Sequence, residues 1–94
     1  MKHQVYISDC TEFEAGWGQR PDGFLITESL EAMNRKIKES NKMGSREYFW
    51  RYDTPKLVFC DDETFAIIKE KMEKNDFASF ENKEKKNLNL FKKI

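Results

Sequence analysis

Two segments with helical periodicity most constrain how this chain can fold, because each follows a pair of short segments typical of β-strands. Apolar residues recur at every third or fourth position over residues 30–42 and again over residues 61–75, and this spacing places them on one face of a helix. Ser29 and Asp61 can cap the N-termini of these helices. The expected order is therefore strand, strand, helix, strand, strand, helix.

The strands are expected where β-branched and aromatic residues concentrate, at residues 3–8, 23–27, 47–52 and 56–60. We predict an α+β fold, a two-layer ββαββα sandwich with a four-stranded, mainly antiparallel sheet and both helices on one face. Residues 9–23 hold three glycines, one proline and four acidic residues. This composition is typical of a loop, so we expect a loop between the first two strands.

The domain organisation follows from a change in composition after the second helix. We predict a single domain over residues 1–75 and a lysine-rich C-terminal tail over residues 76–94. Residues 81–94 carry five lysines against two glutamates, a local net charge of +3. The tail can dock on the sheet, exchange with a neighbouring subunit or stay flexible, and the sequence leaves these three alternatives open.

Charge and motif content exclude several classes of protein. Seventeen basic residues balance seventeen acidic ones, so no field of one sign attracts bulk nucleic acid or a membrane. No apolar run approaches the length of a membrane span, and the N-terminus lacks a signal-peptide core, so we expect a cytoplasmic protein. Its two cysteines are then expected to be reduced thiols. With one histidine and no nucleotide-hydrolase, metalloprotease or dinucleotide-binding motif, we expect no metal, no cofactor and no catalysis.

Residues 16–23, with the sequence Gly-Trp-Gly-Gln-Arg-Pro-Asp-Gly, are the first candidate binding segment. Trp17 stands between glycines that allow a ligand to approach, and its indole can stack on a nucleobase. Arg20 offers a planar fork for phosphate, while Gln19 and Asp22 can contact a base edge or a ribose. The alternative is structural: Trp17 covers the core and Arg20 pairs with Asp22.

The segment at residues 47–52 is the second candidate, because strand alternation places three aromatic side chains on one face. If Phe49 points inward, this aromatic stripe is an exposed ligand or subunit surface. If the stripe points inward, it belongs to the core, which is the arrangement we expect. Arg46 and Arg51 flank the stripe and can bind phosphates in either case. The stripe consists of Tyr48, Trp50 and Tyr52.

Four carboxylates offer a third, catalytic interpretation. Asp9 and Glu12 lie in the expected loop, and Asp61 and Asp62 follow the fourth strand. If the four converged, they could hold Mg²⁺ and support a small phosphodiesterase. The alternative, which we favour, is that the first pair is solvated loop charge and the second pair caps a helix.

Residues 5–9, 16–24 and 47–52 resemble segments of small bacteriophage proteins that counter host defence. Over roughly residues 1–75 the element order is similar to that of the first Thoeris anti-defence family. Members of that family assemble as oligomers and sequester cyclic ADP-ribose-type or cyclic oligonucleotide signals without cleaving them. The resemblance implies a phage-type, homo-oligomeric protein of the host cytoplasm that captures a small nucleotide immune signal.

No ligand residue is carried over from that family, so the expected ligand-binding residues rest on side-chain chemistry alone. They are Trp17, Gln19, Arg20, Asp22, Arg46, Tyr48, Trp50 and Arg51. The alternative function is a protein–protein inhibitor of a host defence effector, of the anti-CRISPR type, which would use the same aromatic surface.

Overall fold

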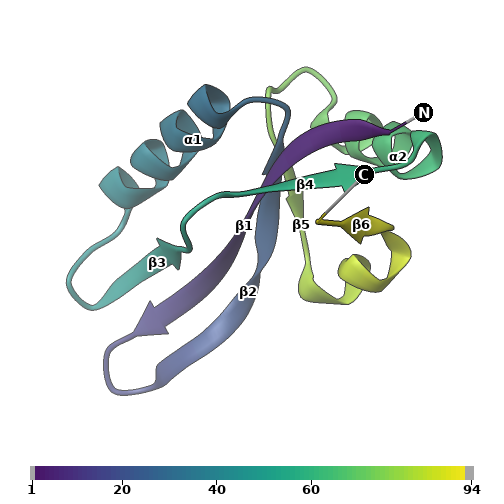
Figure 1. Ribbon diagram of the computed structural model, residues 1–94. Coiled ribbons are helices and arrows are strands. Elements are labelled where there is room, and N and C mark those ends of the chain that lie inside the picture. The colour runs from purple at the N-terminus through teal and green to yellow at the C-terminus, as the bar shows by residue number, and fades with distance from the viewer. Residues whose placement is uncertain (1, 93–94) are drawn as a thin grey trace.

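An open antiparallel sheet and three helices form the part of the chain that the computed structural model describes, residues 2–92 (Figure 1). Met1, Lys93 and Ile94 lie outside the described residues, so the end of the expected tail does too. The elements are β1 (His3–Glu14), β2 (Gly18–Thr27), α1 (Leu30–Met43), β3 (Tyr48–Tyr52), β4 (Lys56–Cys60), α2 (Asp62–Met72), β5 (Ala78–Phe80), the 3₁₀ helix η1 (Asn82–Asn87) and β6 (Leu90–Phe91).

The sheet is built around β1, which is long enough to serve two partners along one edge. Its strand order is β5-β2-β1-β4-β6, and β3 also pairs with β1. Residues 3–7 of β1 pair with β4, and residues 10–14 pair with β3. The α+β class and the antiparallel pairing are confirmed, but the sheet has six strands among the described residues, not four. The additional strands, β5 and β6, come from the segment that we set apart as a tail.

The prediction of a loop at residues 9–23 is wrong, because these residues form the half of the β1–β2 hairpin that is next to its turn. Glu14 pairs with Gly18, and the Trp17 amide donates to the Glu14 carbonyl over 3.0 Å to close the turn. Gly16, the third residue of that turn, has φ of +87°, which favours glycine. Pro21 is tolerated in β2 because β5 pairs only with residues 24–26, so the outer edge at Pro21 needs no donor.

Gly23 marks an irregularity in β2 where the pairing with β1 shifts register between Asp9 and Thr11. Its φ is +89°, and a Cβ at this position would lie 2.1 Å from the Phe80 carbonyl oxygen of β5. Only glycine lets β5 approach so closely. The glycines that suggested a loop therefore form a turn and a close strand contact.

Both helices begin where the sequence indicates. Ser29 Oγ accepts from the Ala32 amide over 3.1 Å, and Asp61 Oδ1 accepts from the Thr64 amide over 2.8 Å. These are N-cap hydrogen bonds that satisfy otherwise unpaired helix amides. The second helix ends at Met72 rather than near residue 75, because Glu73 adopts φ of +52° and leaves the helical conformation.

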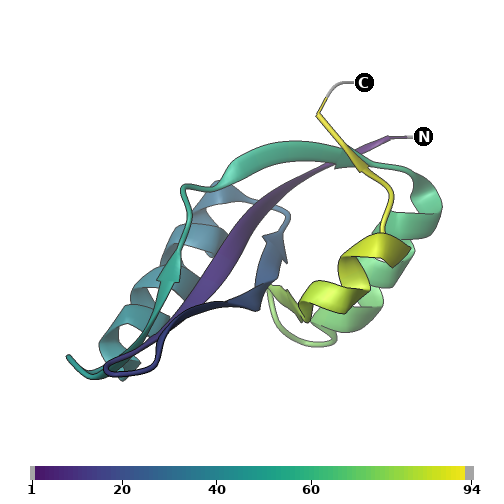
Figure 2. The same cartoon turned by 90° about the horizontal axis from the view of Figure 1, so that it is seen from below.

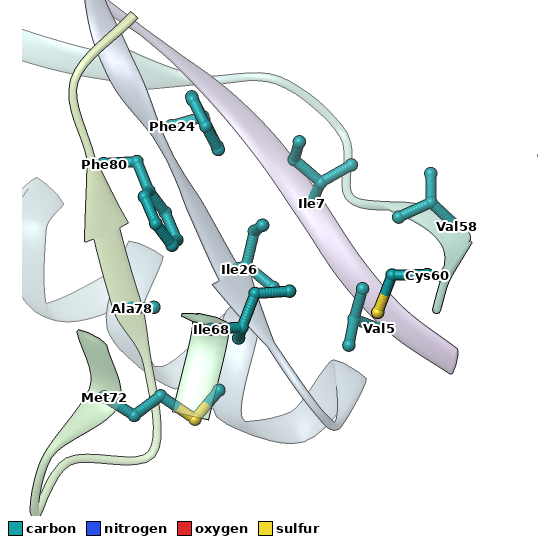
Figure 3. Close-up of a cluster of buried hydrophobic side chains, with 10 residues drawn as sticks. All are labelled: Val5, Ile7, Phe24, Ile26, Val58, Cys60, Ile68, Met72, Ala78 and Phe80. Atoms are coloured by element: carbon teal, nitrogen blue, oxygen red, sulfur yellow. The ribbon is translucent and has the colours of Figure 1, made fainter. Parts of the chain in front are cut away.

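The expectation that both helices cover one face is wrong, as the burial of neighbouring residues in β2 shows. Phe24 and Ile26 point into the cluster that contains α2, whereas Leu25, between them, points to the side of α1. In Figure 2, α1 and α2 accordingly lie on opposite sides of the β1–β2 hairpin. The fully apolar cluster under α2 is shown in Figure 3 and consists of Val5, Ile7, Phe24, Ile26, Val58, Cys60, Ile68, Met72, Ala78 and Phe80.

The α1 side has a smaller and more polar interior. Met33 is fully buried, but Leu30, expected on the same stripe, is 43% exposed. Beneath the helix lie Leu25 and a buried thiol, Cys10. Both cysteines are free and buried, in agreement with the expected reduced thiols.

Candidate functional site

Trp17 lies at the tip of the β1–β2 hairpin, where its side chain is largely in solvent. The residue is 84% exposed, and the glycines on either side leave open space around the backbone. The alternative in which Trp17 covers the core is therefore wrong. A large exposed indole at the end of a protruding hairpin is available for contact with a ligand or a partner.

Arg20 is anchored by the buried carboxylate of Glu12, two residue pairs away from the pair that closes the hairpin turn. Glu12 lies directly opposite Arg20 in the hairpin, and its side chain is only 8% exposed. Arg20 Nε donates to Glu12 Oε1 over 2.9 Å, and Nη2 lies 2.6 Å from the same oxygen. The pairing of Arg20 with Asp22, which belonged to the structural alternative, is not formed; Arg20 pairs with Glu12 instead. The buried charge of Glu12 is compensated by this pairing.

The Arg20 guanidinium keeps N–H donors that the contact with Glu12 does not use. Its side chain is 73% exposed, and Nη1 lies on the far side of the planar group from Nε. Within residues 2–92, no hydrogen bond engages Nη1. Tyr48 lies beside Glu12, and its interaction with this carboxylate raises the pKa of the Tyr48 hydroxyl. Arg20 is thus held in one orientation with free donors facing solvent.

A small hollow of about 180 Å³ lies between these groups. Ligand sites for drug-sized molecules usually enclose about 300–1,000 Å³, so the hollow on one chain holds only part of such a molecule. Its lining residues are Glu12, Glu14, Trp17, Gly18, Gln19 and Arg20.

The aromatic stripe of β3 is half-buried on the side of α1. Tyr52 donates from its hydroxyl to Ser40 Oγ of α1 over 3.4 Å, and Tyr48 meets Trp50 edge-on with ring centroids 5.1 Å apart. Phe49 points to the opposite face and stacks on Phe13 at 4.7 Å. The stripe therefore faces α1, as expected, but its three side chains are only half-buried and do not belong to the buried core.

The other four predicted site residues are Gln19, Asp22, Arg46 and Arg51, and each has a different setting. Arg51 points to the face opposite Arg20 and contacts Gln19 Oε1 at 3.4 Å. Asp22 borders a separate open depression of about 640 Å³ between β2, α2, β5 and η1, and Arg46 is exposed ahead of β3. The structure therefore brings Trp17, Arg20, Tyr48 and Trp50 to one side of the hairpin, and the charge of Asp22 lies near enough to act on Tyr48. Arg51 contacts Gln19 from the opposite face, although Gln19 also borders the hollow.

Glu12 is the residue whose role the sequence interpretation missed, because it was considered only as a metal ligand or as solvated loop charge, whereas its side chain is buried. A turn centred on Gly16 pairs residues equally distant from it, so Glu12 faces Arg20. The opposite charges at equal distances from a Gly-rich turn were the available signal.

The four carboxylates of the catalytic interpretation are not brought together. Asp9 pairs with Lys85 at 3.1 Å, on the face opposite Glu12. Asp61 caps α2, and Asp62 accepts a hydrogen bond from His3 Nε2 at 2.6 Å, which lowers the pKa of Asp62. Both lie at the other end of β1 from Glu12. Among residues 2–92, no group of three or more histidine, cysteine or acidic side chains is placed to hold a metal ion.

Comparison of the chain with protein-family models, with curated proteins and with solved structures found no match. No helix within the described residues is both long enough and apolar enough to cross a membrane.

Proposed function

We propose that this chain is a binding protein that captures a nucleotide at the tip of the β1–β2 hairpin and leaves it chemically unchanged. The observation that carries the proposal is that an exposed indole, Trp17, lines the same hollow as Arg20, whose guanidinium is held in place by a buried carboxylate. A flat aromatic surface and an oriented cation are the two groups that recognise a base and a phosphate.

The energetics favour such a site because its parts are fixed before the ligand arrives. Stacking of a base on an aromatic side chain contributes about 1–3 kcal/mol. Glu12 holds Arg20 in the folded chain, so less conformational freedom is lost when a phosphate binds. Among residues 2–92, no hydrogen bond or ring contact holds the Trp17 side chain, so its rotamer freedom is lost when a base stacks on it.

The resemblance to phage anti-defence proteins suggests that the ligand is a cyclic nucleotide immune signal of the host cytoplasm. The hollow of about 180 Å³ is too small to enclose a molecule of that size. A homo-oligomer, in which a further copy covers the rest of the ligand, is therefore part of the proposal.

A second candidate is a protein–protein inhibitor of a host defence effector. The small volume of the hollow favours it, since a protein partner can cover an indole without an enclosed pocket. Trp, Tyr and Arg are the residues that most often dominate binding energy at protein interfaces, and all three types occur around the hairpin tip.

A thermal-shift screen with cyclic dinucleotides, cyclic trinucleotides and ADP-ribose isomers tests the first candidate. A ligand at a hundred times its Kd stabilises the fold by about 2.7 kcal/mol, which raises the Tm by on the order of 10 °C or more for a domain of this size. Chromatography of the released ligand must return it intact. No shift with any compound contradicts nucleotide capture, and an altered ligand contradicts capture without cleavage.

Trp17→Ala then locates the site, with Ile67→Ala on the exposed side of α2 as the matched control. Because Trp17 is exposed, its replacement is expected to leave the Tm unchanged while it weakens binding by about tenfold or more. The control is expected to bind normally. Equal binding by both variants would place the ligand elsewhere.

A further inference from the structure

The hollow at the tip of the β1–β2 hairpin (Figure 1) contains a carboxylate that the described chain does not use. Glu14 lines this hollow together with Trp17 and Arg20, and it is half-buried. Within residues 2–92, no hydrogen bond or ion pair engages its side chain. The other carboxylate of the hollow, Glu12, is paired with Arg20. Glu14 is therefore the carboxylate that remains available to a ligand.

Gly18 explains why Glu14 has no partner across the hairpin. Glu14 lies opposite Gly18 in the pairing of β1 with β2, and glycine has no side chain to offer. A Cβ at Gly18 would meet nothing within 4 Å, so the space beside Glu14 is open. At the equivalent place beside Glu12, the guanidinium of Arg20 fills the space. A ligand that enters the hollow can therefore reach Glu14.

Three chemically different groups follow one another along this face of the hairpin. Glu12 and Glu14 are two residues apart on β1, so they point to the same face at positions about 7 Å apart. Arg20, opposite Glu12, lies farthest from the turn, and Trp17 lies in the turn itself. Glu14 lies between them. The order toward the tip is a cation, a carboxylate and an aromatic ring.

The electrostatics agree with this spacing. The hydrogen bond from Arg20 to Glu12 and the charge of Glu12 raise the pKa of Arg20, and the charge of Glu14 adds a smaller contribution in the same direction. Glu14 is thus near enough to Arg20 for one small molecule to contact both. Among residues 2–92 no hydrogen bond joins the two side chains, so the free donors of Arg20 stay available to an anion.

A nucleotide carries its own groups in the matching order of phosphate, ribose and base. With the phosphate on Arg20 and the base stacked on Trp17, the ribose lies beside Glu14. An ionised carboxylate is an acceptor only, and the ribose hydroxyls are donors. Dinucleotide-binding folds use an acidic side chain for the same hydroxyl groups. Hydrogen bonds to a charged group are also stronger than those between neutral groups.

We propose that Glu14 accepts hydrogen bonds from the ribose of the captured nucleotide, so that the site selects ribonucleotides with a free ribose hydroxyl. This inference rests on the proposed capture of a nucleotide and deepens it by naming the sugar. A deoxyribonucleotide would cover Glu14 with C–H groups, so the carboxylate would lose water without gaining a donor. A cyclic nucleotide linked through its 3′ and 5′ oxygens keeps the 2′-hydroxyl and meets the requirement.

Adenosine 5′-monophosphate and its 2′,3′-dideoxy counterpart are the probes, because they share the base and the phosphate and differ only in the ribose hydroxyls. One hairpin tip can contact a mononucleotide, so the comparison does not require a homo-oligomer. In NMR titrations, the unmodified chain is expected to bind the ribonucleotide at least about tenfold more tightly. Glu14→Ala is expected to bring the ratio of the two Kd values close to one. The ratio is the readout, because loss of a negative charge or of local structure acts on both compounds alike.

Glu47→Ala is the matched control, since it removes an exposed carboxylate beside the hairpin turn, where the Glu47 carbonyl accepts from the Ala15 amide. It is expected to keep the full preference for the ribonucleotide. Glu14→Gln, which keeps the shape of the side chain without its charge, is expected to show an intermediate preference. Circular dichroism establishes that each variant is folded.

Two results would overturn the role of Glu14 and leave nucleotide capture standing. One is equal binding of both compounds by the unmodified chain, and the other is a preference that survives Glu14→Ala. If neither compound binds at millimolar concentration, the tip holds no ribose and the inference is again overturned. The thermal-shift screen with cyclic nucleotides then decides separately on the proposed function.

Discussion

Gly23 allows a direct test of how the C-terminal segment lies against the sheet, because the effect of its conformation can be separated from the effect of its packing. Gly23 and Gly16 have nearly the same backbone angle, with φ of +89° and +87°. An alanine at either position adopts a left-handed conformation at a cost of about 1–2 kcal/mol. At Gly16 the added Cβ meets nothing within 4 Å, whereas at Gly23 it meets the Phe80 carbonyl oxygen at 2.1 Å.

Gly23→Ala must therefore displace β5 as well. Phe80 is buried and stacks on Phe24 with ring centroids 5.1 Å apart, so β5 cannot move without disturbing the close-packed cluster. Overpacking of this kind costs about 1–3 kcal/mol. We expect Gly23→Ala to lower the free energy of unfolding by about 2–5 kcal/mol, against about 1–2 kcal/mol for Gly16→Ala.

Urea unfolding followed by circular dichroism at 222 nm measures the difference between the two variants. The additional loss for Gly23→Ala corresponds to a Tm lower by about 4–8 °C for each kcal/mol. If the two variants unfold with free energies within about 0.5 kcal/mol of each other, β5 does not lie against Gly23 and the described docking of the C-terminal segment is wrong.

Three further expectations concern charge, thiol chemistry and capping. The hydrogen bond from the Thr64 amide lowers the pKa of Asp61 below its usual 3.8. The stability that the ionised Asp61 adds to the fold is therefore present above that pH and is lost as the pH falls below it. The Tm difference between Asp61→Asn and the unmodified chain should be largest at pH 7 and vanish in acid. Burial raises the pKa of Cys10 to about 11, and Cys60 is fully buried. Neither thiol should therefore react with a thiol reagent at pH 8 until urea unfolds the chain. Rapid labelling of the native protein would contradict the buried placement of both cysteines. Ser29→Ala should lower the free energy of unfolding by about 1 kcal/mol through loss of the α1 N-cap, and an unchanged urea midpoint would show that the cap is dispensable.

Local signals predicted the helices and β4 well, because capping residues and periodicity act within a few positions along the chain. The far half of the hairpin was missed for a non-local reason. Its glycines and acidic residues resemble a loop until their partners across the sheet are known: Glu12 is neutralised by Arg20, and Asp9 by Lys85 from the other end of the sequence. Composition within residues 9–23 cannot supply those partners.

The position of the helices was wrong for a related reason. Each helix has one apolar stripe, and the sequence does not say which face of the sheet that stripe meets. Residues 24–27 of β2 are all buried, a continuous run typical of a strand covered on both faces. That run was the available signal for two opposed helices. For the site, chemistry alone identified Trp17 and Arg20, but only the strand pairing shows that Glu12 orients Arg20.

The division of one edge of β1 between two partners gives this strand two local stabilities. Residues 3–7 lie beside β4 and contribute Val5 and Ile7 to the apolar cluster, whereas residues 10–14 lie beside β3 with fewer buried apolar neighbours. At the junction, Ser8 Oγ donates to the Asp53 carbonyl at 2.6 Å. Local opening requires less free energy where less apolar surface is buried. The amides of residues 10–14 should therefore exchange with solvent when the hairpin alone opens. The amides of residues 3–7 should exchange only when the whole chain unfolds.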